Sequence, residues 1–272
     1  MTPTLRRLTA VTALVMIAAI PAAAQDDPDM DINFAQPDFM LTSLPTTLRL
    51  PRHKSAFRVT HRFTRPLGDG DFGSLLEDFF GLDTGAQIGL EYRFGLFRGT
   101  QLGIHRTSDR TIEFFAQHQI FTQGESFPLT IDAFGSIDGT NNFRDSYTPV
   151  LGAVISRTVK EHAAFYVHPL WANNANLKPS EVIEHNDSFL VGFGTRLRVR
   201  PTVYIVAEAA PRVAGDDPGA TQITFGLEKR AGGHNFQLTF GNGFGTTMGQ
   251  VARGAANTED WYLGFHISRK FY

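Results

Sequence analysis

Charged side chains that could line a path for small solutes recur on one face of the alternating segments of this sequence. In the stretch SAFRVTHRFTR, Arg58 and Arg62 share one parity, whereas Phe57, Val59 and Phe63 share the other. The same parity argument selects five basic and four acidic residues: Arg58, Arg62, Glu91, Arg93, Asp132, Arg196, Arg198, Glu208 and Glu228. If these side chains surround a common space, they either select which solutes or ions pass or close that space through ion pairs. The sequence leaves both interpretations open.

The histidines and cysteines give no indication of a metal centre. Five histidines lie at spacings that do not match the usual patterns of metal ligands: His61, His105, His118, His162 and His168. The chain contains no cysteine, which excludes disulfides, thiolate chemistry and a lipid-anchored cysteine. We therefore predict neither a metal site nor a bound cofactor.

One pair of residues has the types needed for hydrolysis. His266 and Ser268 are similar to the His/Ser pair of outer-membrane phospholipases, in which a polar third residue orients the histidine. Those enzymes carry the pair on their lipid-facing side. Here both residues share the parity opposite Leu263, Phe265 and Ile267, and no third member is evident. We therefore predict no catalytic residue.

The elements that must position these side chains are β-strands, because apolar and polar residues alternate over many segments. The abundance of phenylalanine and glycine, 24 and 26 residues, fits strands with one apolar face. We predict about twelve strands of roughly 8–12 residues. Their spans are 55–66, 86–97, 100–108, 111–122, 127–138, 147–159, 161–172, 188–200, 202–211, 221–230, 234–242 and 260–272.

The connections between these segments alternate between short and long. The long ones span 67–85, 139–146, 173–187, 212–220 and 243–259, with one short exception near Asp109. This layout is typical of an outer-membrane barrel with its short turns in the periplasm. A secreted β-sandwich is the alternative, although it would typically carry more lysine on its strands. We predict an all-β fold, an antiparallel transmembrane β-barrel of about 12 strands, within a range of about 10–14.

One helical pattern is predicted, in the first long connection. In DFGSLLEDFFGLD, Asp71 stands at the N-cap position and Gly81 follows the end of the helix. The apolar stripe has helical spacing and consists of Phe72, Leu75, Leu76, Phe79 and Phe80. This short amphipathic helix could plug the mouth of the barrel, lie on the membrane, dock a partner, or pack on the rim.

The N-terminal residues have the pattern of a secretory signal peptide. Arg6 and Arg7 precede the apolar run LTAVTALVMIAAI, and small residues follow up to Ala24. We predict cleavage near Ala24, so that 1–24 is a signal peptide, 25–45 a flexible acidic periplasmic leader and 46–272 the barrel. No later run of roughly 18 apolar residues offers a helical membrane span. The formal net charge of −2 gives no reason to expect nucleic acid as a partner.

The last predicted strand, WYLGFHISRKFY, resembles the signal that the barrel assembly machinery reads. Tyr262, Gly264 and Ile267 resemble the internal positions of that signal, and Phe271 and Tyr272 supply its terminal aromatic residues. Aromatic residues of this strand are also expected to form girdles at the two membrane interfaces. These are Trp261, Tyr262, Phe271 and Tyr272.

Several short motifs follow one another in the first part of the predicted barrel. His61-Arg62-Phe63 ends the first strand, Phe80 to Asp83 reads Phe-Gly-Leu-Asp, and Gly89 to Tyr92 reads Gly-Leu-Glu-Tyr. A Gly-x-x-Arg turn follows, formed by Gly103 and Arg106. With these motifs, the chain from about Thr46 to its C-terminus resembles a family of uncharacterised bacterial membrane-bound β-barrel domain proteins. The resemblance implies the fold and no particular chemistry.

Together these patterns predict a monomeric outer-membrane β-barrel that acts as a narrow porin-like channel for small solutes or ions. The alternative is a plugged barrel that serves as a scaffold or anchor for a periplasmic or extracellular partner. A lipid hydrolase is the third and least favoured interpretation. The expected partners are outer-membrane lipid, the barrel assembly machinery and a small solute or ion, without nucleic acid.

Overall fold

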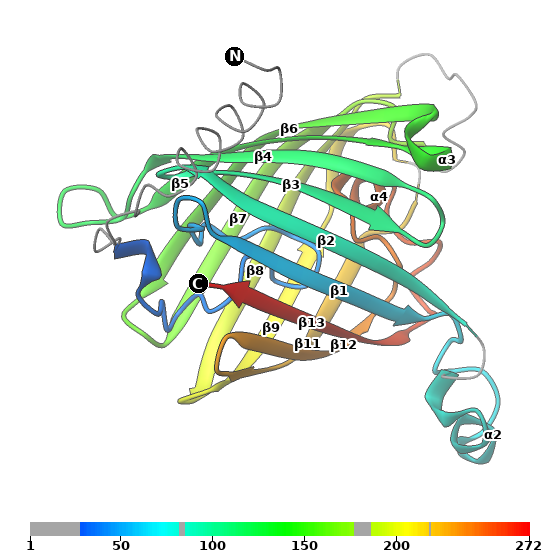
Figure 1. Cartoon of the computed structure of the whole chain (residues 1–272). Helices are drawn as coiled ribbons and strands as arrows, with labels where there is room; N and C mark the ends of the chain where they lie inside the picture. The colour runs from blue at the N-terminus through cyan, green and yellow to red at the C-terminus, as the bar shows by residue number, and fades with distance from the viewer. Residues whose placement is uncertain (1–27, 82–84, 177–185, 218) are drawn as a thin grey trace, which may run out of the picture. The chain divides into compact units, whose positions relative to one another are not determined.

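The computed structural model describes residues 28–81, 85–176, 186–217 and 219–272 (Figure 1). Two compact units divide the chain between Asp31 and Ile32. Of the first unit the structure describes only residues 28–31, which include the 3-10 turn η1 (Pro28–Met30). The predicted signal peptide at 1–24 lies outside the described residues. The second unit, Ile32–Tyr272, contains all of the described strands.

Twelve antiparallel strands close into a ring, as the sequence predicted. Consecutive strands pair with one another, and β13 pairs with β1, which closes the ring. The segments are β1 (Ser55–Phe63), β2 (Ala86–Phe97), β3 (Thr100–Thr107), β4 (Ile112–Phe121), β5 (Thr130–Gly139), β6 (Asp145–Val159), β7 (Ala163–Ala172), β8 (Ser188–Arg200), β9 (Val203–Ala210), β10 (Arg212–Gly215), β11 (Gln222–Ala231), β12 (His234–Gly241) and β13 (Tyr262–Phe271).

Two of these segments, β9 and β10, form a single strand of the wall. Both pair with β8, one after the other, and only Pro211 separates them. Proline has no N–H group to donate, so it interrupts the ladder at that point. The ring therefore has twelve strands although thirteen segments are distinguished in the described part of the chain.

The wall is apolar on the outside and polar on the inside. Leu227 and Leu238, which face each other on β11 and β12, are 54% and 44% exposed. Glu228 and Gln237, the next pair along, are 0% and 4% exposed. A water-soluble sandwich buries its apolar face and exposes its polar one, whereas a wall that meets lipid has the arrangement seen here. The chain is a membrane β-barrel, and the soluble alternative is wrong.

The two ends of the barrel differ in the length of their connections. Connections of two or three residues, at 98–99, 160–162, 201–202 and 232–233, lie at one end, which we call the short-turn end. The opposite, long-loop end carries the connections at 64–85, 173–187 and 242–261. This distribution follows the predicted one. No helix in the described residues is both long and apolar enough to cross a membrane.

The predicted helix in the first long connection is present but shorter than its apolar stripe. It is α2 (Phe72–Glu77), and the N–H of Ser74 donates to the carboxylate of Asp71, 2.9 Å away, which caps it. Phe79 and Phe80 follow in the turn η2 (Phe79–Gly81) with positive φ angles of 47° and 57°, and therefore lie outside the helix. No residue of α2 is buried, and the helix lies outside the ring (Figure 1). Of the four roles considered for this helix, a plug in the mouth does not fit this position.

Two further short helices were not predicted from the sequence. α3 (Thr140–Phe143) forms part of the connection between β5 and β6, and α4 (Met248–Arg253) lies in the last long loop. α4 begins with a capping box, in which Thr247 and Gln250 each accept hydrogen bonds from the other's backbone. Six residues are too few to show a helical period, so only the cap could have indicated this helix.

Candidate functional site: the lumen and its mouth

A hairpin formed by residues 33–50, which we call the inner hairpin, occupies the lumen. Its side chains from Ala35 to Thr47 are all buried. The chain reverses at residues 41–44, where the N–H of Leu41 donates to the carbonyl of Leu44 at 2.8 Å, and Met40 and Pro45 form an antiparallel bridge. This differs from the sequence prediction of a flexible, solvated leader over 25–45, because residues 35–45 lie inside the barrel.

Both arms of the inner hairpin meet the wall near the short-turn end. The guanidinium of Arg198, close to the turn after β8, lies 4.6 Å from the centroid of the Phe34 ring. In the returning arm, the carbonyl of Leu48 accepts a hydrogen bond of 3.2 Å from the side chain of Gln101 at the start of β3. The tip at Thr42 and Ser43 therefore points toward the long-loop end.

Polar side chains of the wall hold the inner hairpin through its main chain. The carboxylate of Glu208 accepts the N–H groups of Thr42, Ser43 and Leu44 at 2.8–3.0 Å. Other wall residues bond to its carbonyl oxygens: Arg196 to Met40, Gln237 to Leu41, Arg58 to Thr42, His168 to Pro45, Gln117 to Thr46 and Asn235 to Pro37. Since these bonds come from many strands, the hairpin is fixed on all sides of the lumen.

Two glycines of β8 make room for the tip of the inner hairpin. A Cβ atom at Gly194 would overlap the side chain of Leu41, and one at Gly192 would lie 2.9 Å from a methyl carbon of Leu44. Leu41 and Leu44 are 0% and 1% exposed. These glycines thus make part of the apolar contact between the wall and the inner hairpin, next to the hydrogen bonds of Glu208.

Three of the predicted lumen charges form one cluster where β1 and β2 pair. Glu91 lies between two arginines, with its carboxylate 3.5 Å from Arg58 and 2.9 Å from Arg93. The guanidinium of Arg93 also lies 4.5 Å from the centroid of the Phe115 ring. All three charged groups are buried, so each arginine is compensated by Glu91 rather than by solvent.

The other predicted lumen charges are distributed along the inner wall. Arg196 and Glu228 form a fully buried ion pair of 2.9 Å, and Asp132 accepts a 2.6 Å hydrogen bond from Gln117. Arg198 is the exception to full burial, because it pairs with the exposed Glu161 at the short-turn end. Of the nine predicted charges, the structure thus places eight in the lumen and one at its rim.

The last long loop folds back into the long-loop end and closes it. All six residues of α4 are buried. Its first N–H, on Met248, donates to Glu113 at 2.9 Å, and Arg253 near its end pairs with Asp138 at 3.2 Å. Thr247 also donates to Asp138, at 2.7 Å. This loop thus takes the place at the mouth that the sequence analysis gave to α2.

The inner hairpin and the last long loop meet at Ser43. Its hydroxyl donates to the carbonyl of Gly245 at 3.0 Å and accepts a hydrogen bond of 2.7 Å from Arg62. The same guanidinium donates to the carbonyl of Gly243 at 2.7 Å. Arg62, predicted only as a lumen charge, therefore links the two segments that fill the lumen.

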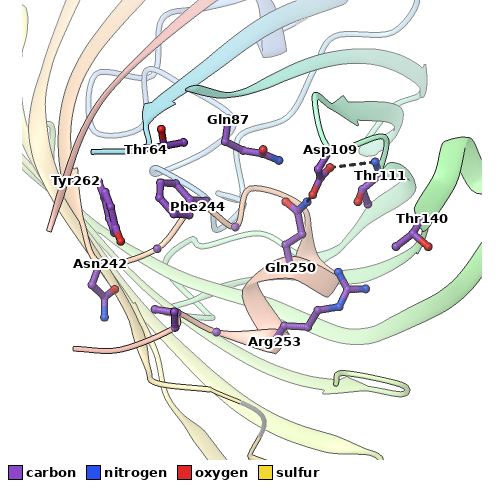
Figure 2. Close-up of a pocket in the computed structure, with 15 residues that line it drawn as sticks. Thr64, Gln87, Asp109, Thr111, Thr140, Asn242, Phe244, Gln250, Arg253 and Tyr262 are labelled. Carbon is purple, nitrogen blue, oxygen red and sulfur yellow. Dashed lines mark hydrogen bonds between the residues drawn. The ribbon is translucent and has the colours of Figure 1, made fainter. Parts of the chain in front are cut away.

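A cavity of about 400 Å³ opens between the last long loop and the wall, at the long-loop end (Figure 2). The rings of Phe244 and Tyr262 lie on one side of it, with their centroids 4.4 Å apart. Asp109 and Gln250 lie on the other side, joined by a 2.9 Å hydrogen bond. Deeper in the lumen, two further cavities measure only about 10 Å³ each. Of these three cavities, the one at the mouth is therefore by far the largest.

The residues proposed for hydrolysis also point into the lumen, but they engage different partners. Nδ1 of His266 lies 2.9 Å from Arg58 and 3.0 Å from Gln237. The hydroxyl of Ser268 donates to Asp38 of the inner hairpin at 2.7 Å. Neither residue faces the lipid.

The five other histidines noted in the sequence are scattered over the barrel. His168 lies 2.7 Å from the carbonyl of Pro45, His105 lies 3.8 Å from Glu113, and His61 stacks on Phe265 at the outer surface. The remaining two are His118, beside Thr100, and His162, in a short turn. Within the described ranges, no three His, Cys, Asp or Glu side chains are grouped in a way that could hold a metal ion.

The residues proposed as an assembly signal lie on or just after β13. Gly264 faces the lumen, Ile267 lies on the opposite face, and Phe271 and Tyr272 are exposed at the short-turn end. Tyr262 lines the mouth cavity. The expectation that Tyr262 belongs to an outer aromatic girdle is therefore wrong, because its even parity turns it inward together with Gly264.

Sequence reasoning missed the residues that hold α4 and the hairpin. Asp138 and Glu113 lie near the ends of their strands, where alternation is least reliable as a guide. Gln117 and Gln237 are uncharged and were not considered as lumen residues, although both share the inward parity. Attention to inward amides, and to the Thr247–Gln250 capping box, would have found part of this network.

Comparisons with known proteins agree with the fold. Residues 38–271 match the family model described as Membrane bound beta barrel domain (DUF5777), and no curated protein matches the sequence. Similar solved structures include the KdgM porin in complex with disordered oligogalacturonate, with a TM-score of 0.51 and 8% identity over 80% of this chain and 99% of that chain. The NanC porin gives a TM-score of 0.52 and 7% identity over 80% and 99%. The COG4313 outer membrane channel from Pseudomonas putida F1 gives 0.51 and 13% over 82% and 97%.

Proposed function

The chain belongs to the family of membrane-bound β-barrel domain proteins, and from that premise we propose that it is a narrow porin-like channel for small polar solutes or ions. In this structure the channel is closed by the inner hairpin and by the last long loop. The likeness in fold to porins and to an outer membrane channel supports the proposal. It is not proposed to be an enzyme, since His266 and Ser268 face the lumen and bond to other groups.

The single observation that carries the proposal is the kind of contact that fills the lumen. Polar side chains of the wall bond to the main chain of the inner hairpin, with Glu208 alone accepting three N–H groups. These bonds lie beside an apolar cluster that includes Leu41 and Leu44. Water or a polar solute can replace such hydrogen-bond partners, so the same wall can line an aqueous path once the hairpin has left.

We place this channel in the bacterial outer membrane. The proposal includes cleavage near Ala24, insertion by the barrel assembly machinery through the β13 residues Tyr262, Gly264, Ile267, Phe271 and Tyr272, and function as a monomer. With an even number of strands, both ends of the ring's chain lie on one side, which in outer-membrane barrels is the periplasmic side. The inner hairpin would then enter from the periplasm and the last long loop from outside.

Conductance of the refolded protein in a planar bilayer tests the proposal. The open variant lacks residues 33–50 and has a short Gly-Ser linker in place of 246–254, so that neither the inner hairpin nor α4 remains. A matched control lacks residues 70–81, which include α2, and α2 lies outside the ring. We expect discrete conductance steps from the open variant, and rare steps from the full-length chain and from the control. Heat-modifiable migration in gels checks that every variant is folded.

Silence from a folded open variant would contradict the channel. It would favour the second candidate, a plugged barrel that anchors a partner, for which one observation speaks. Phe72 and Phe79, in and next to α2 in a loop of the long-loop end, are 67% and 66% exposed. Exposed aromatic residues outside the membrane-facing wall are a common feature of docking surfaces.

A further inference from the structure

The mouth cavity is a pocket with a floor rather than a passage. α4 closes it below, and all residues of that helix are buried. Its volume of about 400 Å³ lies within the ~300–1,000 Å³ of small-molecule sites. A solute that enters from the long-loop end would therefore stop at this cavity before it reaches the closed lumen.

The two sides of the cavity differ in chemistry (Figure 2). Phe244 and Tyr262 form an aromatic side, with their rings tilted by 49° to each other. On the opposite side Gln250 and Arg253 extend from α4 toward Asp109 and Thr111. A ligand that suits both sides must present carbon-bound hydrogens to the aromatic faces and hydrogen-bonding groups to the polar side.

The polar side has one buried donor without a partner, and a carboxylate that already accepts three hydrogen bonds but is still exposed. Arg253 is only 8% exposed, and its Nε has no hydrogen-bond partner among the described residues, whereas its Nη2 bonds to Asp138 and to Thr148. A buried N–H without a partner costs free energy, which a ligand oxygen can recover. The carboxylate of Asp109 is exposed and can accept further hydrogen bonds.

The charges around the cavity favour an uncharged ligand. The carboxylates of Asp109, Glu113 and Asp138 would repel an anionic ligand, whereas the guanidinium of Arg253 is already paired with Asp138. Hydroxyl groups, in contrast, both donate and accept, which matches Asp109 and Arg253 together.

We propose that the mouth cavity binds an uncharged polyhydroxylated solute of sugar type. The C–H face of its ring lies on Phe244 and Tyr262, and its hydroxyls bond to Asp109 and to the guanidinium of Arg253. The inference deepens the proposed function, on which it rests, because it names the class of solute that reaches the channel.

Isothermal titration calorimetry on the refolded full-length protein tests this site. The detergent must lack sugar headgroups, and the probes are maltose and, separately, digalacturonate as its acidic counterpart. We expect maltose to bind, digalacturonate to bind at least about tenfold more weakly, and Phe244→Ala to weaken maltose binding about tenfold, as the loss of an aromatic contact implies. Phe236→Ala, which removes an aromatic ring from the lipid-facing wall, is the matched control and should bind maltose like the unmodified chain. Arg253→Lys keeps the charge but removes Nε, and should also weaken binding.

Three results would overturn the site: no heat from maltose, equal affinity for the acidic probe, or maltose binding that Phe244→Ala leaves unchanged. Because calorimetry needs no open pore, failure of this site and failure of the channel are separate results. Maltose binding by a barrel whose open variant is silent would remove the channel and keep the site. Conductance without maltose binding would keep the channel and remove the site.

Discussion

One of the tight apolar fits in the lumen is between Gly194 and Leu41. Because a Cβ at position 194 would overlap the leucine, Gly194→Ala should displace the tip of the inner hairpin. We expect a loss of about 1–3 kcal/mol in the free energy of unfolding, the usual cost of overpacking, together with more frequent channel openings. Urea unfolding in lipid vesicles and bilayer conductance measure the two effects.

A second variant separates this contact from a general effect on β8. Leu41→Ala removes the methyl groups that meet the new Cβ, so the double variant should be more stable than the sum of the single effects, with a coupling of about 0.5–3 kcal/mol. Strictly additive losses would mean that Gly194 is needed by the strand itself and not by the hairpin.

At the scale of residues, the alternation along each strand predicted which side chains face the lumen, but it did not predict which groups they bond to. Alternation turned Arg58, Glu91 and Arg196 inward correctly, since β-strand geometry alone decides it. It could not show that Arg196 bonds to the carbonyl of Met40 or that Glu208 accepts the N–H of Thr42. Those contacts join residues more than 150 positions apart, and no local period in the sequence encodes them.

The N-terminal cap of α2 can be tested by lowering the pH. The N–H of Ser74 donates to the carboxylate of Asp71, and this bond holds the pKa of Asp71 below its usual value. A group whose pKa is lowered on folding stabilises the folded form above its unfolded pKa, and that stabilisation is lost as the pH falls through the lowered pKa. We therefore expect the start of α2 to fray in acid, seen as faster amide exchange at Ser74 between about pH 5 and about pH 2.

Asp71→Asn is the matched control for this cap. Asparagine caps helices about as well as aspartate and does not titrate in this range. Its amide exchange, corrected for the intrinsic effect of pH, should stay level as the pH falls. The same acid-induced fraying in this variant would show that another group controls the helix.

At the scale of elements, the strands could be predicted and the segments that fill the barrel could not. Each wall strand is long enough to show a period of two, because one face meets lipid and the other a polar interior. The inner hairpin has no such period. The acidic, proline-containing stretch QDDPDMD that precedes it suggests a solvated tail. The burial of the hairpin depends on wall residues whose bonding partners could not be identified from the sequence. α4 was missed because it spans only six residues.

For the barrel as a whole, the charges of the wall predict weak ion selectivity. The predicted lumen charges that are buried consist of four arginines, Arg58, Arg62, Arg93 and Arg196, and four carboxylates, Glu91, Asp132, Glu208 and Glu228. Without the inner hairpin these charges largely cancel along the path. Glu113 and Asp138 add two carboxylates to the path, because the open variant lacks Met248 and Arg253, which bond to them here. We therefore expect the open variant to show the reversal potential of a weakly cation-selective pore in a potassium chloride gradient.

Arg196→Gln in the open variant provides the comparison. It leaves Glu228 without its 2.9 Å partner, so the reversal potential should shift further toward that of a cation-selective pore. A strong anion preference in the starting variant, or no shift on substitution, would contradict a path along this wall.

The inner hairpin enters and leaves the ring of strands at the same end, with its tip reversed at residues 41–44. The inner hairpin therefore does not thread through the barrel, because both of its arms pass the same end of the ring. Withdrawal toward the short-turn end therefore breaks no strand pair, needs no free chain end and leaves the wall intact. A force applied to the tip of the inner hairpin from the long-loop end would push the hairpin toward the short-turn end. A force applied from the short-turn end would act directly on its two arms. The inner hairpin thus closes the barrel from the short-turn end alone, and it stays covalently attached to the wall through β1.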